Sequence, residues 1–117
     1  MSEYHEPYEV LDERARDFHR AIRSLMEELE AVDWYHQRVS ATKDETLRAV
    51  LAHNRDEEIE HACMALEWIR RNMPGWDEQL RTYLFTEGPI TEIEAGRNGS
   101  AGRSPKDLGL GRPAREA

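Results

Sequence analysis

Glu58 and His61 lie three residues apart in a polar stretch, residues 54–61, of an otherwise amphipathic segment. On an α-helix this spacing places both side chains on one face, where a carboxylate oxygen and an imidazole nitrogen can hold one cation. Helical proteins that bind two metal ions between four helices use such Glu-x-x-His pairs, joined by a single Glu from each remaining helix. The pair alone is a weak signal, because Glu is abundant and five His offer many chance spacings.

A single carboxylate also interrupts the apolar positions of the preceding segment. From Pro7 to Ser40 the inward positions follow the alternating steps of three and four residues that are typical of packed helices. They are Phe18, Ala21, Leu25, Glu28, Val32, Tyr35 and Val39. The same steps in residues 44–72 give Leu47, Leu51, Asn54, Glu58, His61, Ala65 and Trp68. A carboxylate in such a seam is costly unless it is paired, protonated or bound to a cation, so Glu28 is a candidate ligand.

The two polar interruptions should lie at the same height of a helical hairpin. The short link at Ser40–Asp44, with Thr42 and Glu45 at capping-box spacing, predicts two antiparallel helices. Residues 28 and 58 are each fifteen residues from residue 43 in that link, and residue 61 follows about 4.5 Å further along the axis. Two carboxylates and one imidazole at one level suit iron or manganese better than a metal bound by thiolates.

Length and composition predict one small all-α domain. The chain has 117 residues, and its β-branched and aromatic residues are too scattered for strands. We expect an N-terminal arm at 1–6, a helical hairpin domain at 7–95 with short helices at 76–85 and 89–95, and a flexible tail at 96–117. Gly96 is expected to stop the last helix, and five of the seven Gly lie from that residue onward.

Charge and cysteine content exclude several classes of function. Residues 1–94 hold 11 Lys and Arg against 22 Asp and Glu, which argues against a nucleic-acid-binding face and favours cations. The lone Cys63, expected to be a small buried residue, cannot form an internal disulfide and fits a reducing compartment. There is neither a signal peptide nor an 18-residue apolar run, so we expect a soluble cytoplasmic protein without membrane contact.

One hairpin supplies only Glu28, Glu58 and His61, and two helices cannot bury both seams or enclose an ion. Two copies related by a two-fold axis would form a four-helix bundle with two single Glu and two Glu-x-x-His pairs. The sequence therefore predicts a homodimer whose interface is the metal site.

Other residues near these ligands admit two interpretations. Tyr35, two turns after Glu28, is either a donor or redox neighbour of the site or a core aromatic residue. Glu27, Glu30 and Trp34 form a flank beside the seam that is either a path for cations or a solvated acidic face.

Four blocks of the sequence closely resemble the encapsulated ferritins: residues 26–35, 51–58 with 60–61, 66–71 and 81–90. The resemblance spans roughly residues 5 to 95 and implies a ferroxidase that oxidises Fe(II) with dioxygen at a di-iron centre between two chains. It implies Glu28, Glu58 and His61 as ligands with Tyr35 nearby, and metal uptake past Glu27, Glu30 and Trp34. It further implies a ring of five dimers inside an encapsulin shell that stores the iron. The tail departs from the family, because Leu108–Gly111 matches the family's shell-docking motif only in part.

Three other functions remain open from the residues alone. One is a cargo or adaptor protein whose C-terminal tail matters more than its site. A dimeric helical interaction module could use the buried Glu and His only to fix register. Another ferritin-like carboxylate enzyme, of rubrerythrin or manganese type, could use the same ligands with peroxide.

Overall fold

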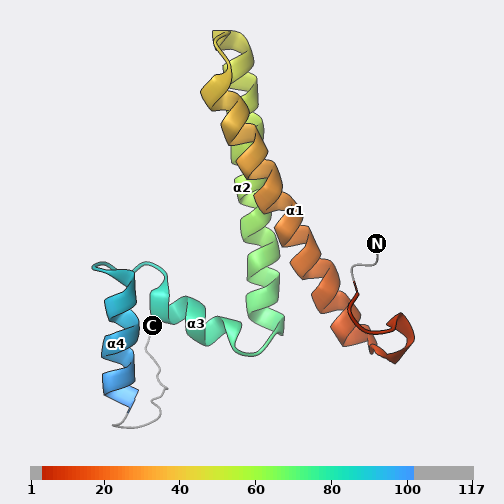
Figure 1. Cartoon of the computed structure of the whole chain (residues 1–117), viewed down its shortest axis with the longest axis vertical. Coiled ribbons are helices and arrows are strands. Elements are labelled where there is room, and N and C mark those ends of the chain that lie inside the picture. The colour runs from red at the N-terminus through yellow and green to blue at the C-terminus, as the bar shows by residue number, and fades with distance from the viewer. Residues whose placement is uncertain (1–3, 102–117) are drawn as a thin grey trace. The chain divides into compact units, whose positions relative to one another are not determined.

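The computed structural model describes residues 4–101, with side chains up to residue 96, and this part of the chain forms helices without strands (Figure 1). The elements are a short 3-10 helix η1 (Tyr8–Val10) and the α-helices α1 (Glu13–Ala41), α2 (Glu45–Asn72), α3 (Trp76–Tyr83) and α4 (Ile90–Ala101). The predicted all-α class is confirmed. The chain divides after Pro74 into two compact units, which are described separately.

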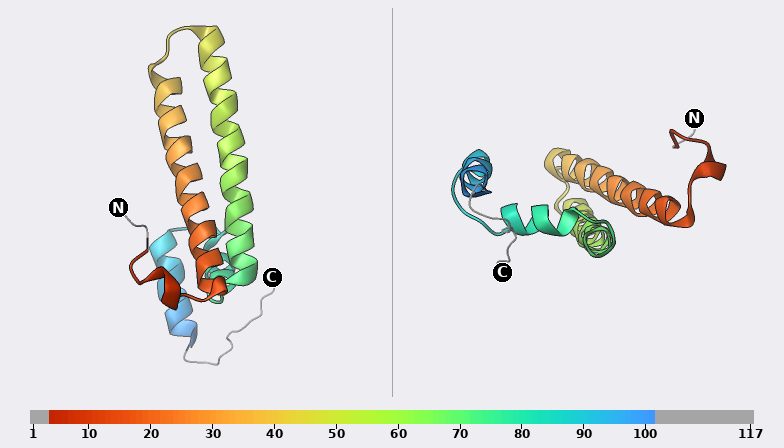
Figure 2. Two further views of the ribbon diagram at one scale, coloured as in Figure 1. Left: turned by 90° about the vertical axis from the view of Figure 1, so that its right-hand side faces the viewer. Right: turned by 90° about the horizontal axis from the view of Figure 1, so that it is seen from below.

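Helices α1 and α2 form the predicted antiparallel hairpin and run side by side over most of their lengths (Figure 2). Helix α1 begins at Glu13, later than the expected Pro7, because the Asp12 side chain caps it by accepting a hydrogen bond from the Ala15 amide at 2.8 Å. The expected capping box of Thr42 and Glu45 is wrong. Asp44 caps α2 instead and accepts from the Leu47 amide at 2.9 Å, while Thr42 ends α1.

The surface of α2 that packs against α1 is rotated from the predicted seam. Ala62 and Ile69 are the buried side chains of the described chain, and neither was among the expected inward positions. Three residues that were expected inward, Leu47, His61 and Trp68, are exposed. The small side chain of Ala62 and the branched side chain of Ile69 fit the close helix contact, so the polar and bulky residues one position earlier lie at its edge.

The open end of the hairpin is closed by Arg14. Its Nη2 donates to the Asn72 carbonyl at 3.0 Å and to the Asn72 Oδ1 at 3.1 Å. The guanidinium lies 4.9 Å from the ring centroid of Phe18 and 5.9 Å from that of Trp68, and these two rings meet edge to face. This cluster joins the start of α1 to the end of α2.

The second unit contains α3 and α4. Gly75 and Gly88 adopt positive φ of 98° and 89°, a conformation that suits glycine, at the turns preceding the two helices. Gly96 was expected to end the last helix, and this is wrong, because α4 continues through it to Ala101. A glycine in a helix interior costs about 1 kcal/mol relative to Ala, and the helix tolerates it here.

Residues 1–3 and 102–117 lie outside the described part, and with them part of the predicted arm and the Leu108–Gly111 segment. Within the described residues, no helix combines the length and apolar character that crossing a membrane requires.

Candidate metal centre

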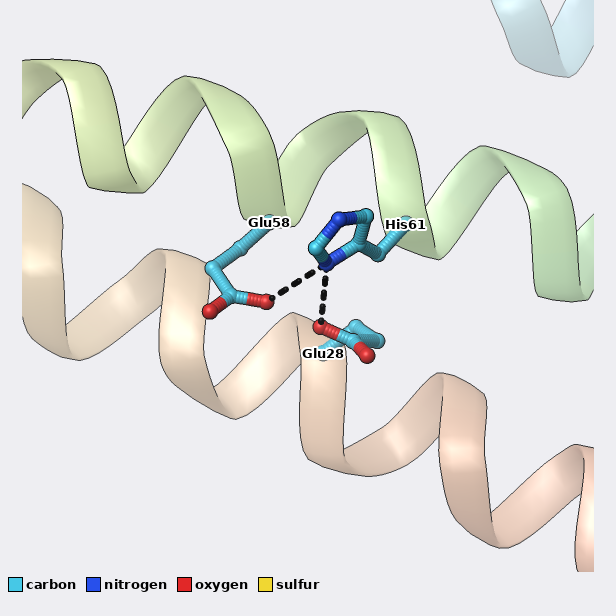
Figure 3. Close-up of side chains that lie close together, drawn as sticks. All are labelled: Glu28, Glu58 and His61. Carbon is cyan, nitrogen blue, oxygen red and sulfur yellow. Dashed lines mark hydrogen bonds and ion pairs between the residues drawn. The ribbon is translucent and has the colours of Figure 1, made fainter.

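The structure brings Glu28 of α1 together with Glu58 and His61 of α2 (Figure 3). The Nδ1 of His61 lies 3.3 Å from Glu58 Oε1 and 3.8 Å from Glu28 Oε1. One ligand atom from each of the three residues falls within 4.8 Å of the others. Glu28 and Glu58 meet at one height as the hairpin register requires, and the three-residue spacing turns His61 toward them.

The two carboxyl groups form a hydrogen bond with each other and shift each other's pKa. A hydrogen bond with Glu58, together with desolvation and the nearby negative charge, raises the pKa of Glu28 above its ordinary value. The same hydrogen bond and that of His61 lower the pKa of Glu58. Of the two carboxyl groups, Glu28 is therefore the one that keeps its proton to higher pH. A cation bound by both carboxylates would take the place of this proton.

The cluster is open on one side of the hairpin. The side chains of Glu28 and Glu58 are 29% and 25% exposed, and that of His61 is 46% exposed. Large apolar side chains, between 36% and 63% exposed, follow the His61 face of α2 at helical spacing: Leu47, Val50, Met64 and Trp68. A polar cluster framed by exposed apolar side chains is typical of a surface that a partner covers.

The remaining predicted residues lie beside this cluster. Tyr35 is half-buried, and the Arg38 guanidinium lies 5.2 Å from its ring centroid. Glu27, Glu30 and Trp34 are exposed on α1, and Glu27 forms an ion pair with Arg23 at 3.5 Å. The metal-binding roles assigned to these residues remain predictions.

Sequence reasoning missed the contacts that join the helices on the turn side of the cluster. Arg48 donates to the Thr42 carbonyl, with its Nε at 3.0 Å, and Arg55 Nη1 lies 3.1 Å from His36 Nδ1. The seven-residue spacing of Arg48 and Arg55, which places both on one face of α2, could have indicated these contacts. The expectation that Cys63 is buried is also wrong, because it is exposed.

A helical hairpin that presents two carboxylates and one imidazole from facing helices resembles half of the ligand arrangement in four-helix carboxylate metal proteins. The EncFtn-like family profile matches residues 3–87, and the chain belongs to that family.

Three curated relatives are similar to this chain. One is a "Ferritin-like protein" of Thermotoga maritima, 64% identical over 92% of this chain and 95% of its own length. Another is an "Encapsulated ferritin-like protein" of Rhodospirillum rubrum, 70% identical over 78% of this chain but only 65% of its own length. A third is "Encapsulin nanocompartment cargo protein EncC" of Myxococcus xanthus, 38% identical over 76% of this chain and 74% of its own length.

Among solved structures, the chain is similar to the crystal structure of protein ne0167 from Nitrosomonas europaea. The two share 62% identity with a TM-score of 0.73, over 76% of this chain and 98% of that one. The predicted resemblance to encapsulated ferritins is confirmed.

Proposed function

We propose that this protein is a ferroxidase that oxidises Fe(II) to Fe(III) with dioxygen at a di-iron centre between two copies of the chain. The observation that carries the proposal is the convergence of Glu28, Glu58 and His61 from two helices, with ligand atoms within 4.8 Å of one another. Carboxylate oxygens with one imidazole suit iron, and the donor set fits a hard or borderline divalent cation.

A second copy completes the donor set. One hairpin offers two carboxylates and one imidazole, which is half of the arrangement that di-iron four-helix bundles use. A two-fold axis through the exposed face would bring two such halves together, because an interface of this symmetry places the same residues opposite one another. It would also cover Met64 and Trp68, which one hairpin leaves exposed. Their burial favours the dimer.

The residues of the site act through charge and placement. The four carboxylates of a dimer balance the charge of two Fe(II) ions and favour the ferric product. Glu28 would release its proton when an ion binds, and Glu58 and His61, held on one face of α2, would serve as ligands. Each Fe(II) would give up one electron, so two ions would supply the two electrons that, with two protons from solvent, reduce one dioxygen to hydrogen peroxide.

Three exposed residues on α1 would guide iron to the centre. Glu27 and Glu30 lie within two residues of Glu28 and are exposed, as is Trp34 further along the helix. Their carboxylates attract Fe(II) from solution, and Tyr35, half-buried two turns from Glu28, would lie near the reacting ions.

The chain would act inside an encapsulin compartment. Relatives named as encapsulated and as encapsulin cargo support this partner. A ring of five dimers is the assembly that the family resemblance implies. Leu29 and Ile59, which follow Glu28 and Glu58 and so point about 100° away from them, are 55% and 44% exposed. This second exposed apolar surface supports an assembly larger than one dimer.

The chemistry is tested by an anaerobic Fe(II) titration followed by admission of air. Glu28→Ala, Glu58→Ala and His61→Ala should each abolish or greatly slow iron oxidation while the circular dichroism remains helical. Glu60→Ala is the matched control, because Glu60 is an exposed neighbour on the same helix. Wild-type rates in all three site variants contradict the proposal.

Assembly and shell docking are separate measurements. Molecular mass in chelator and in Fe(II) separates a metal-driven dimer from a purely structural helical module, which would assemble equally in both. Co-expression with an encapsulin shell, with and without residues 103–117, tests whether the tail directs encapsulation. A truncated chain that is packaged as well as the full chain would rule out the tail as the docking segment.

A further inference from the structure

Arg55 joins α2 to α1 close to the metal centre. Its Nη1 lies 3.1 Å from Nδ1 of His36, and its Nε donates to Asp56 Oδ1, also at 3.1 Å. The side chain of Arg55 is only 24% exposed, compared with 63% for Asp56. An arginine cannot accept a hydrogen bond, so His36 Nδ1 is the acceptor and the ring proton lies on Nε2.

The position of Arg55 on α2 gives this contact an effect on Glu58. Arg55 precedes Glu58 by three residues and His61 follows it by three, and each step of three falls about 60° short of a full turn. The two residues therefore diverge to opposite sides of Glu58. His61 contacts Glu28 on one side, and Arg55 holds α1 on the other. Together they set the rotation of α2 about its own axis.

Apolar packing is thin where this contact lies. The buried side chains Ala62 and Ile69 follow Glu58 along α2, away from the turn. Between the turn and the centre the inward residues Val32, Tyr35 and Leu51 are only half-buried. Arg55, with Arg48 bonded to the Thr42 carbonyl nearer the turn, is therefore placed to restrain this half of the hairpin.

A small rotation matters at the centre. A Glu carboxylate lies about 6 Å from its helix axis, so a rotation of about 10° moves it by about 1 Å. Metal sites need their ligands held within about 0.5 Å and 10–20°.

We propose that Arg55, acting through its hydrogen bond to His36, is a positioning residue that holds Glu58 and His61 in register with Glu28 for metal binding. The proposal rests on the function proposed above, because it assigns Glu28, Glu58 and His61 as ligands. It adds two residues that touch neither the ion nor its ligands.

The test uses Co(II), added alone to the full-length chain, as a probe of affinity and of ligand geometry through its visible absorption spectrum. Arg55→Met should weaken Co(II) binding by about tenfold, which is the lower end of the effect of removing residues that orient metal ligands. It should also change the intensity of the visible bands. Arg71→Met is the matched control. Arg71 lies on the same helix, and its Nε bonds to Glu67 one turn away at 2.7 Å.

Variants of His36 separate the hydrogen bond from general stability. His36→Gln keeps an acceptor for Arg55 and should bind Co(II) like wild type, whereas His36→Leu should resemble Arg55→Met. If the two residues act as a pair, the double variant Arg55→Met with His36→Leu is no weaker than either single variant. Arg55→Lys, which keeps one donor, should fall between Arg55→Met and wild type.

Two results overturn the inference in distinguishable ways. If Co(II) binding is lost in Glu28→Ala but stays within twofold of wild type, with the same spectrum, in Arg55→Met and His36→Leu, the positioning role is wrong and the metal site stands. If Co(II) binding to wild type does not depend on Glu28, the proposed function fails and the positioning role fails with it.

Discussion

Metal binding at this centre should depend on pH through the proton that Glu28 shares with Glu58. The hydrogen bond from Glu28 to Glu58 raises the pKa of Glu28 and lowers that of Glu58, so between these two pKa values the pair carries one proton. An ion bound by both carboxylates must displace it. Below the raised pKa of Glu28, each unit of pH should therefore change the affinity by about tenfold, or about 1.4 kcal/mol, and above that pKa this dependence should end.

The stability of the metal-free hairpin should follow the opposite direction. The pKa of Glu28 is higher in the folded than in the unfolded chain, so its stabilising contribution is present below the unfolded pKa and is lost as pH rises through the folded one. Glu58 has a lowered pKa, so its contribution is lost only as pH falls through that lower value. Raising pH through the pKa of Glu28 should therefore strengthen metal binding while weakening the metal-free fold.

Glu28→Gln separates these two effects. The amide can still donate a hydrogen bond to Glu58 but cannot ionise, so metal-free stability should no longer fall as pH rises through the pKa of wild-type Glu28. Metal affinity should be lower at every pH, and its pH slope should decrease by one proton per ion.

The assay is an anaerobic Co(II) or Fe(II) titration in a series of buffers, paired with thermal unfolding of the metal-free protein at each pH. Glu57→Gln is the control, because Glu57 is exposed and its ion pair is with His53 at 3.9 Å, outside the cluster. Equal pH slopes for wild type and Glu28→Gln would show that Glu28 does not hold the displaced proton.

Three further changes test the packing around the site. Met64→Glu places a charge on the exposed apolar face beside His61 and should prevent the dimer from forming, which sedimentation measures; an unchanged mass would exclude this face as the interface. Asp44→Ala removes the cap of α2 and should lower the free energy of unfolding by about 1 kcal/mol in a denaturant titration, whereas no loss would show that the cap is not stabilising. Arg70 and Arg71 lower the pKa of Glu67 to about 2, but these exposed ion pairs are screened by solvent. Glu67→Gln should therefore leave the unfolding temperature at neutral pH nearly unchanged. A clear fall in that temperature would contradict this.

The position of the site along the hairpin could be predicted from sequence, because it depends only on residue spacings. The register of an antiparallel hairpin follows from the position of its turn, and the three-residue spacing of Glu58 and His61 fixes one helix face. Neither quantity needs knowledge of packing. The same reasoning gave the correct helix pair and turn without identifying Asp44 as the cap, since Thr42 has the better capping-box pattern.

The rotation of α2 could not be predicted in this way. A heptad pattern assumes that every apolar residue faces the same neighbour, but the apolar residues of this helix serve two surfaces. Ala62 and Ile69 face α1, whereas Leu47 and Trp68 lie at the edge of the contact between the two helices and remain exposed. In the proposed dimer, the second of these surfaces would face the other copy. The sequence would then contain two apolar patterns at once, and the predicted seam lies between them.

The presence of apolar residues on two surfaces of α2 also gives a reason to expect that metal binding is coupled to assembly. A hairpin with two buried side chains has little apolar burial with which to offset the conformational entropy of about seventy ordered residues. In the proposed dimer, covering the face that contains Met64 and Trp68 would add burial, but it would also bring the carboxylates of two copies together. Without cations their repulsion would oppose the dimer, and with cations the same charges would favour it. We therefore expect this face to be covered most favourably when metal is present.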